Sequence, residues 1–520
     1  MDETRALQTV YACVSDTDRD EEVHIEGQSR RQSIYIADPK QHVPNGGLND
    51  TAQTAQITST FADHAELVAS PTEPWLSPTI DHTASSQLED HTNEDYDATV
   101  EDSYIEVTPA IGSYGHDASQ SVTISRTVSQ LLPQLYLEKS ALPLTDMGEA
   151  MLFRYYCTHL ARNSDILDPQ RHFRTVVPLR AATCPILLNA IFALSARHLS
   201  RIGQFNPLIS NAYYQACLQR LIPLLSDSAS EAILDENLLA AHVILRHLEE
   251  LEVPLTGFSP SNDGPTHLLG SHIFITAQER AVDSGGLREA AFWVGLRQDI
   301  YVAFVNQSAA IPTLEYCNIS RTCEPDAPDQ IWSRIMVALC AQIICYCFAG
   351  DDQDGAVWQT STYTSLARSV AWWYESKPDS FTPIYYMAAS ADEVFPQLWF
   401  ASDEVVVGLQ HYHLAKILLS AHDPSIPRLG PRGTIALREV DHDIREQVRA
   451  LCGICTSNTD TAPNFAYASM AITMAGDKFT SIQDQEAMLE ILETTDHQHG
   501  WPTDRARDAL KVAWGWTSNV

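Results

Sequence analysis

Residues 290–307 form the stretch that most narrows the choice of folds for this chain. Their sequence, AAFWVGLRQDIYVAFVNQ, is apolar on nearly all sides, yet Arg297, Gln298 and Asp299 follow one another in its middle. Moving such groups out of water costs several kcal/mol unless hydrogen-bond partners are supplied. Arg297 and Asp299 cannot pair with each other, because residues two apart on a helix do not face each other. We therefore expect a buried core helix in which each of the three polar residues bonds to a neighbouring helix.

The chain after about residue 128 also has a helical pattern. Residues 234–248 place an apolar side chain every three or four positions, which makes one stripe along a helix. Similar stretches fall at 146–163, 182–203, 208–225, 266–282, 287–307, 328–349, 357–376, 400–420, 434–454, 464–480 and 503–515. The sequence shows no run of alternating strands and no repeat of fixed period. It predicts an all-α fold, with one large domain of about a dozen helices over residues 146–516.

The first 125 residues have a different composition. Residues 41–125 contain fourteen acidic residues and no lysine or arginine, and large apolar side chains are sparse. Such a segment cannot bury enough surface to offset the entropy of the chain, so residues 1–125 are predicted to be disordered. Residues 94–107 intersperse aromatic and aliphatic residues among six acidic ones. This alternation is typical of activation segments and also fits a solvated acidic linker, and both interpretations stay open.

The net charge argues against one class of function, and the cysteines indicate the redox state of the compartment. Lys and Arg total 33 against 67 Asp and Glu, which gives a formal net charge of −34. A strongly acidic chain repels the phosphate backbone, so we expect no direct DNA binding by this chain. The eleven cysteines lie mostly in apolar runs, as buried free thiols do in a reducing compartment. The most apolar run, 335–350, is too short to span a bilayer comfortably, so we expect a buried helix and no membrane contact.

Two short motifs contain residues that act chemically in other settings. Cys452 and Cys455 form a C-x-x-C, but at the end of an expected helix rather than in the βαβ unit where such a pair is a redox dithiol. His411 and His413 are two apart on an expected helix, so they point to different sides. G-x-S-x-G, Walker A, Rossmann glycine and H-E-x-x-H motifs are absent from the sequence. We expect no catalytic residue, no cofactor and no metal site, and therefore no enzyme.

Several blocks, taken in order, resemble a known family. One block reads FW-x-x-x-RQDIYVA-x-x-x-Q and includes Trp293, Arg297, Gln298, Asp299, Tyr301 and Gln307. The other blocks are FRTVVPLRAATCPILLNAIFALSARHL at 173–199, ENLLAAHVILRHLEE at 236–250, an HL-x-G entry within 265–270 and HGWPTDRARDALKVAWGW at 499–516. Together they resemble the fungal-specific transcription factor domain over about residues 146–516. That domain is the helical regulatory domain of fungal binuclear zinc-cluster transcription factors.

The zinc cluster that usually accompanies this domain is not found in the sequence. The resemblance implies a six-cysteine block built from C-x2-C-x6-C units, whose thiolates hold two Zn²⁺ ions. Before residue 150 this chain has only Cys13, and one thiolate cannot build that site. Three interpretations stay open: a chain start set too late, a natural truncation that acts through partners, or another role.

The resemblance implies a nuclear transcriptional regulator. We expect it to act through the transcription machinery or another DNA-binding regulator, and a homodimer or a small-molecule effector is compatible with that role. The alternative is a cytoplasmic helical scaffold or small-molecule-binding protein with no role in transcription. For Arg297, Gln298 and Asp299 we expect a structural clamp that holds the bundle, with a contribution to an effector pocket as the alternative. Target genes, the effector and the direction of regulation are not determined by the sequence.

Overall fold

The computed structural model describes residues 135–203, 205–225, 234–252, 285–311, 313–314, 317, 322–349, 355–390, 393–427, 429–461 and 463–516. The chain divides into two units, Met1–Gly115 and His116–Val520, and all described residues belong to the second. The region 1–125, the acidic segment 94–107 and the helix expected at 266–282 lie outside the described residues. The domain boundaries stay predictions.

Helices form nearly all of the regular structure in the described residues. In chain order they are α3 (Met147–Tyr155), the π-helical turn η2 (Tyr156–Leu160), α4 (Ala161–Asp165), α5 (His172–Thr175), α6 (Val177–Ala181), α7 (Pro185–Arg201), α8 (Pro207–Leu225), α9 (Glu236–Glu250), α11 (Gly286–Asn306), α12 (Asp329–Phe348), α13 (Gly355–Ser376), η6 (Asp379–Phe381), α14 (Asp403–Ala421), α15 (Gly430–Ser457), α16 (Asn464–Ala475), η7 (Gly476–Lys478), α17 (Ile482–His499) and α18 (Asp504–Ala513). The prediction of an all-α fold is confirmed for this part of the chain.

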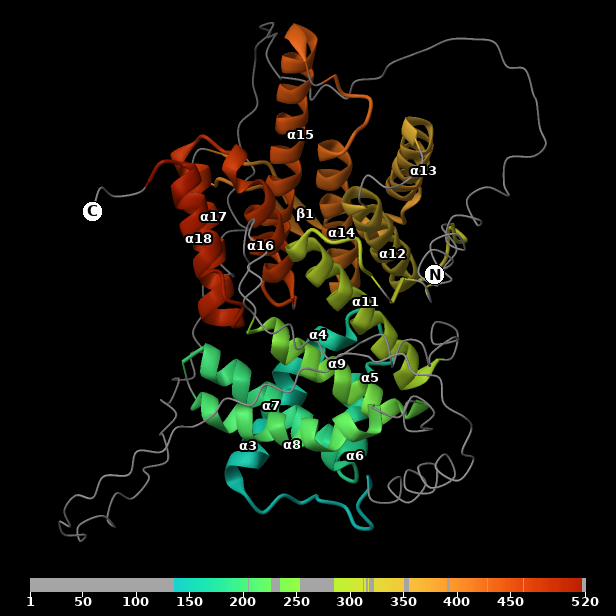
Figure 1. Ribbon diagram of the computed structural model, residues 1–520, viewed down its shortest axis with the longest axis vertical. Helices are drawn as coiled ribbons and strands as arrows, with labels where there is room; N and C mark the ends of the chain where they lie inside the picture. Colours follow the sequence, from blue (N-terminus) through green and yellow to red (C-terminus); the bar gives the residue numbers. More distant parts are fainter. Residues whose placement is uncertain are drawn as a thin grey trace, which may run out of the picture. The chain divides into compact units, whose positions relative to one another are not determined.

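Helix α11 lies between two groups of helices. In Figure 1, helices α3 to α9 (cyan to green) gather on one side, and helices α12 to α18 (gold to red) on the other. Helix α11 contacts α4, α5 and α9 of the first group and α12 and α16 of the second. A helix with neighbours on so many sides needs apolar side chains all round. This is why residues 290–307 show no clear polar face.

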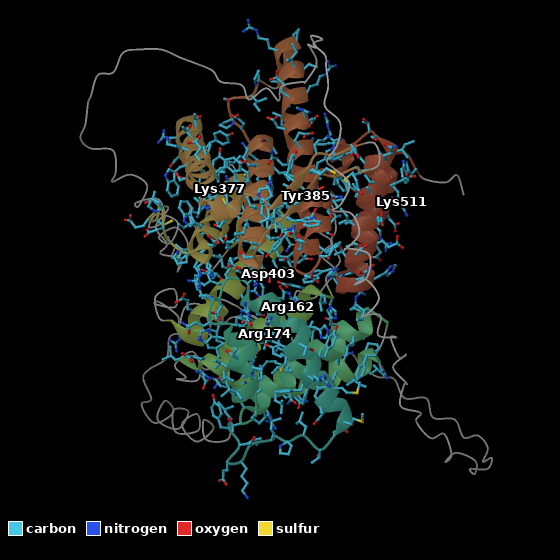
Figure 2. All side chains as sticks on the ribbon, turned by 180° about the vertical axis from the view of Figure 1, so that it is seen from behind. Arg162, Arg174, Lys377, Tyr385, Asp403 and Lys511 are labelled. Atoms are coloured by element: carbon cyan, nitrogen blue, oxygen red, sulfur yellow. The ribbon has the colours of Figure 1, made fainter. Side chains whose placement is uncertain are left out.

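A single hydrophobic core runs through both groups of helices. Its largest fully buried side chains include Trp293 of α11, Trp332 of α12 and Trp373 of α13. The indole N–H of Trp373 donates to the backbone oxygen of Trp332 at 2.8 Å. Arg162 lies where the two groups meet (Figure 2) and donates to the backbone oxygen of Asp460 at 3.0 Å. The groups are therefore joined by both apolar packing and polar contacts.

Helix α12 contains the most apolar run of the sequence. By length and composition it is the one helix among the described residues that could cross a membrane, and 67% of its apolar window is buried inside the protein. That burial is typical of a core helix. The expectation of a buried helix at this run is confirmed.

Two short strands depart from the all-helical prediction. Strands β1 (Tyr385–Met387) and β2 (Gln397–Trp399) pair antiparallel. The α15 backbone approaches this hairpin so closely that a Cβ on Gly453 would lie 2.2 Å from the backbone oxygen of Pro396. Only glycine permits such an approach. The strands are three residues long, too short to produce a recognisable alternation in the sequence.

Helix α17 was not among the stretches predicted to be helical. Its buried apolar residues are Met488, Ile491 and Leu492, which lie at helical spacing. Polar and acidic residues dominate the rest of the helix, and this weakens the apolar stripe. The helix ends at Gly500, whose φ of 75° is left-handed, a conformation that glycine adopts at little cost.

Candidate functional site

The three polar residues in the middle of α11 are deeply buried. The exposed fractions are 6% for Arg297, 5% for Gln298 and 4% for Asp299. The burial predicted for them is confirmed. Buried polar groups in native proteins almost always have hydrogen-bond partners. The partners of these three residues therefore show which other elements α11 is bonded to.

Asp299 has a complete set of partners. Its Oδ1 accepts from Arg246 Nη2 of α9 at 2.6 Å, and both side chains are less than 5% exposed. Its Oδ2 accepts from the backbone N–H of Thr313 at 3.1 Å and from the Thr313 hydroxyl. Both carboxylate oxygens are therefore satisfied, and the ion pair ties α11 to α9.

Gln298 and Arg297 bond to two different helices. Gln298 Nε2 donates to the backbone oxygen of Val243 on α9 at 2.9 Å. Arg297 Nη2 donates to the backbone oxygen of Asn163 on α4 at 2.6 Å. The expected bonds to neighbouring helices are thus confirmed for all three residues. Whether they act as a structural clamp stays a prediction.

The other motif residues on α11 occupy three different environments. Trp293 is buried, and the guanidinium of Arg334 lies 5.0 Å from the centre of its ring. Tyr301 is buried at the opposite end of the polar segment. Gln307 is exposed at the C-terminal end of α11, with a left-handed φ of 50°. The motif therefore includes core residues and one residue that only ends the helix.

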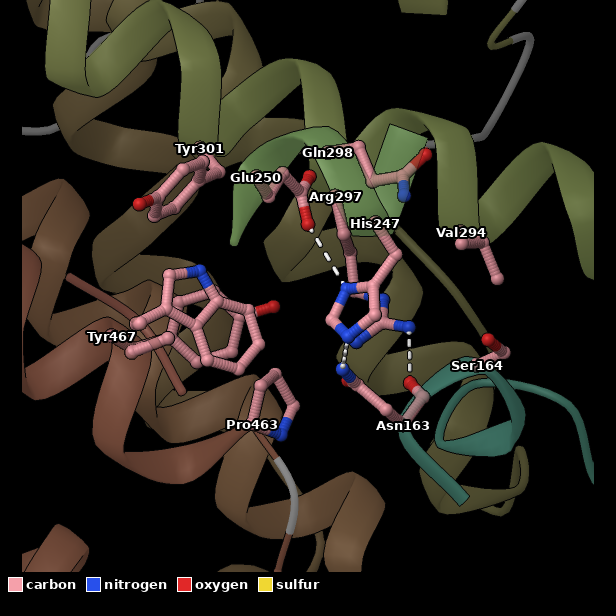
Figure 3. A pocket seen from close by; sticks show the side chains of 12 residues that line it. Asn163, Ser164, His247, Glu250, Val294, Arg297, Gln298, Tyr301, Pro463 and Tyr467 are labelled. Carbon is pink, nitrogen blue, oxygen red and sulfur yellow. Dashed lines mark hydrogen bonds and ion pairs between the residues drawn. The ribbon is translucent and has the colours of Figure 1, made fainter. Parts of the chain in front are cut away.

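A pocket opens beside the polar segment of α11 (Figure 3). Its cavity volume is about 40 Å³, enough for a few water molecules. Its walls come from α4, α9, α11, α16 and the turn between α17 and α18. The lining residues are Asn163, Ser164, His247, Glu250, Val294, Arg297, Gln298, Tyr301, Pro463, Ala466, Tyr467 and Trp501. We call this cavity the α9–α11 pocket.

A chain of polar contacts runs along one wall of the α9–α11 pocket. Glu250 Oε2 lies 3.1 Å from His247 Nδ1, and His247 Nε2 lies 3.4 Å from Asn163 Nδ2. Arg297 reaches the same residue from the other side through the backbone oxygen of Asn163. Figure 3 shows the three contacts as dashed lines. They hold the charged side chains of Glu250 and Arg297 in place around the cavity.

Two buried polar atoms at the pocket nevertheless have no protein partner within the described part of the chain. They are Glu250 Oε1 and Arg297 Nε, and both residues are about 6% exposed. Leaving a buried polar atom unpaired costs about 1–3 kcal/mol, and more for a charged group. Both atoms face a cavity that has room for a few water molecules, and water can supply their missing partners.

Aromatic rings make the remaining wall of the α9–α11 pocket. Burial raises the pKa of Tyr301, the nearby charge of Glu250 raises it further, and a hydrogen bond with Trp501 opposes the shift. Burial also raises the pKa of Tyr467, although the charge of Arg297 and a hydrogen bond with its side chain oppose the shift. Both phenols therefore keep their protons at neutral pH and offer O–H donors. The ring of Trp501 packs edge-on against His247 at 5.1 Å between ring centres.

The cysteine and histidine pairs noted in the sequence lie elsewhere. Cys452 and Cys455 are free, fully buried thiols on α15, and burial raises the pKa of both. Reactive cysteines need a lowered pKa and access, so this pair has the character of core residues. Burial lowers the pKa of His411 and of His413 on α14 to about 4, so both imidazoles are neutral at pH 7. Within the described residues, no group of three or more His, Cys, Asp or Glu side chains is placed to hold a metal ion.

Comparison with known proteins gives one match. Residues 151–253 match the family model of the fungal specific transcription factor domain. The resemblance to that family is confirmed over this segment. No curated protein and no solved structure matches the chain.

The fungal specific transcription factor segment, residues 151–253, contributes directly to the site. It contains Asn163, His247 and Glu250 of the pocket wall, and also Arg246, the partner of Asp299. Helix α11 follows the segment in sequence and packs against its last described helix, α9. The matched segment and α11 therefore build the ion pair and the pocket together.

The sequence did not identify most of the pocket. Of the six motif residues predicted around α11, Arg297, Gln298 and Tyr301 line it, whereas Trp293, Asp299 and Gln307 do not. The residues that sequence reasoning missed are Asn163, His247, Glu250, Tyr467 and Trp501. The family-like blocks at 236–250 and 499–516 contain three of them, but nothing in those blocks shows which side chains face a cavity.

Proposed function

We propose that this chain is a fungal transcriptional regulator whose helical domain is regulatory. The observation that carries the proposal is the match of residues 151–253 to the fungal specific transcription factor domain. That family suggests a protein that regulates transcription, and its members are generally nuclear. The chain acts in the nucleus and has no catalytic activity of its own under this proposal.

The regulator acts through partners rather than by holding DNA itself. The net charge of −34 supports this, since it opposes contact with phosphates, and so does the single cysteine before residue 150. The partners are the transcription machinery, another DNA-binding regulator or a second copy of the chain. Purified chain is expected to show only non-specific DNA affinity, which lies at about 10⁻⁴–10⁻⁶ M at physiological salt. Nanomolar, sequence-specific binding would contradict this part of the proposal.

The regulatory unit extends from about residue 146 to 516, and the acidic region 1–125 stands apart from it. The continuous hydrophobic core from α3 to α18 supports a single unit. In it, Trp293, Arg297, Gln298, Asp299 and Tyr301 hold α11 in place, and Gln307 ends the helix. Limited proteolysis should remove the acidic region first and leave a stable fragment that begins near residue 146. A protease-resistant fragment from the acidic region would contradict this division.

A tethering experiment tests the role in transcription. The full chain is fused to a heterologous DNA-binding domain, and transcription of a reporter carrying the matching sites is measured. We expect a change in reporter output relative to the DNA-binding domain alone, and no change on a reporter that lacks the sites. Unchanged output, with the fusion present in the nucleus at normal abundance, would contradict the proposal.

The alternative is a cytoplasmic scaffold or small-molecule-binding protein with no role in transcription. Imaging of the full chain expressed at its natural level separates the two functions. Exclusion from the nucleus under every growth condition, together with a silent tethered fusion, would favour the alternative.

A further inference from the structure

Four histidines gather where the first group of helices contacts the C-terminal helices α17 and α18. They are His159 of η2, His198 of α7, His247 of α9 and His499 at the end of α17. His198 is the centre of the group, because the charges of the other three act on it. We call these four residues the histidine junction. Three of them, His159, His198 and His499, belong to neither the α9–α11 pocket nor the ion pair of Asp299.

His198 is hydrogen-bonded to two other helices. Its Nδ1 lies 2.9 Å from the hydroxyl of Tyr155 on α3. Its ring also forms a hydrogen bond with the backbone of His499 at the end of α17. A neutral imidazole has one N–H donor and one acceptor nitrogen. One neutral tautomer therefore satisfies both contacts, with Nε2–H donating to the His499 backbone oxygen and Nδ1 accepting from the Tyr155 hydroxyl.

The surroundings of His198 oppose a positive charge on it. Burial lowers the pKa of His198 from 6.5 to about 4, together with the charges of His247, His499 and His159 and against the hydrogen bond with the His499 backbone. Burial lowers the pKa of His499 as well, and its ring stacks on Phe465 at 4.4 Å between ring centres. Both imidazoles are therefore neutral at pH 7.

The charged groups on the surrounding helices are already paired. Asp496 of α17 lies 2.9 Å from Arg201 of α7 and 3.3 Å from Arg507 of α18. Glu250 of α9 lies 3.1 Å from His247. A further positive charge in this junction must compete for carboxylates that other basic groups already contact, so burial of that charge is poorly compensated.

The turn between α17 and α18 packs directly on α7. Gly500, with a left-handed φ of 75°, accepts from Arg201 Nε through its backbone oxygen at 3.1 Å. A Cβ on Gly500 would lie 3.3 Å from Arg201 and 3.5 Å from His198. Helix α18 has a separate anchor, because Trp514 Nε1 donates to the backbone oxygen of Gly476 at 2.9 Å. Loss of the contacts with α7 would therefore free the turn and leave that anchor intact.

We propose that the histidine junction is a pH-sensitive latch, which holds the α17–α18 turn on α7 at neutral pH and releases it in mild acid. Opening returns His198 and His499 to water, where they bind protons more readily. Because the pKa of His198 is lowered in the closed state, its stabilising contribution is complete above about pH 6.5 and is lost as the pH falls towards 4. The latch needs neither DNA nor a partner, so its test is separate from that of the transcription proposal.

Hydrogen exchange of the purified full chain, followed by mass spectrometry, tests the latch. A peptide containing the amides of Gly500 and Trp501 reports opening at the turn. A peptide from α12, which contains no histidine, reports the rest of the domain. His198→Gln keeps a side-chain N–H donor but cannot be protonated, and comparison with wild type at the same pH cancels the intrinsic exchange rate.

The expected result is a pH-dependent difference at the turn alone. Between about pH 7.5 and about pH 5, the ratio of wild-type to His198→Gln exchange rates should rise by about thirtyfold, since opening returns the pKa of one histidine from about 4 to 6.5. The same ratio for the α12 peptide should rise far less. An equal rise in both peptides would mean that acid unfolds the whole domain, and it would overturn the proposal.

A second variant guards against misfolding of the first. His499→Phe keeps an aromatic ring against Phe465 and cannot be protonated, so it should remove part of the acid-dependent exchange at the turn. His497→Gln is the matched control, because His497 lies on the same helix two residues away and is exposed. Its exchange should stay within about twofold of wild type at every pH. Wild-type acid dependence in both His198→Gln and His499→Phe would overturn the proposal.

Discussion

Two buried carboxylates where α9 and α11 meet differ in how many of their oxygens have hydrogen-bond partners in the protein. Asp299 on α11 is 4% exposed, and Glu250 at the end of α9 is 6% exposed. Both oxygens of Asp299 are bonded, one to Arg246 and the other to Thr313. Glu250 has one oxygen bonded to His247, and its Oε1 faces no partner among the described residues.

The difference separates a carboxylate whose partners are all in the protein from one whose partners are only partly in the protein. Burying a carboxylate costs free energy at either position. At Asp299 a closed set of donors offsets that cost within the protein, so the group and its partners must stay together. At Glu250 part of the cost is not offset by the protein, because Oε1 has no protein donor and is left to water in the cavity. The comparison predicts that a change at Asp299 lowers the stability of the fold far more than a change at Glu250.

The largest effect is expected for Asp299→Ala. The change leaves the Arg246 guanidinium buried without its carboxylate, which costs about 3–5 kcal/mol. That is a large part of the stability of a typical domain, so the variant should be poorly soluble or melt far below wild type. Asp443→Ala on α15 is the control, because Asp443 is exposed, and surface changes usually stay within about 0.5 kcal/mol. Equal melting temperatures for wild type and Asp299→Ala would contradict the stabilising role assigned to Asp299.

The next largest effect is expected for Glu249→Gln, which should change how the free energy of unfolding depends on pH. Burial raises the pKa of this carboxyl to about 7 from 4.5, although Tyr214 and Arg246 oppose the shift. The folded state therefore holds the proton more tightly than the unfolded state, and this contribution is lost as the pH rises from about 4.5 through 7. Glu249→Gln has no proton to lose at this position. Relative to wild type it should gain about 1–3 kcal/mol in free energy of unfolding between about pH 5 and about pH 8.

Chemical denaturation of both proteins at several pH values measures this difference. A constant offset between them across that range would show that Glu249 is ionised in the folded state throughout. Glu249 would then resemble Asp299, whose carboxylate is fully hydrogen-bonded within the protein.

A smaller effect on stability is expected for Glu250→Gln. Its Oε1 has no protein donor to lose, and a glutamine can still bond to His247. The free energy of unfolding should change by less than about 1.5 kcal/mol, the size of one ordinary hydrogen bond. Urea denaturation measures it. A loss as large as that for Asp299→Ala would show that Glu250 belongs to the closed network after all.

The smallest effect is expected at Gln307, which shares the sequence motif with Asp299 but lies outside both networks. It is exposed and ends α11 with a left-handed φ of 50°. Gln307→Gly relieves backbone strain but makes the unfolded chain more flexible. The two terms oppose each other, so stability should change by less than about 0.5 kcal/mol. A drop of several degrees in the melting temperature would mean that the Gln307 side chain makes a stabilising contact that the structure does not show.

The central helix was predictable because its signal is local. Residues 290–307 are apolar all round, and only burial accommodates such a helix in water. Arg297, Gln298 and Asp299 must then find partners from other elements. Helix α17 and the β1–β2 hairpin were not predictable in the same way. Their stabilising contacts come from other parts of the chain, and their own periodicity is weak or too short.

Local patterns in the sequence are enough to predict that this chain is helical and that three polar residues of α11 lie in its core. It also carried the family resemblance, since those patterns depend on neighbours within a few turns. Their partners on other helices are visible only in the folded protein, because Arg246, Val243 and Asn163 lie at least 53 residues away along the chain. The same holds for the pocket. A closed network and an open one contain the same residue types, and the difference arises only when distant helices place donors against one carboxylate and leave the other beside a cavity.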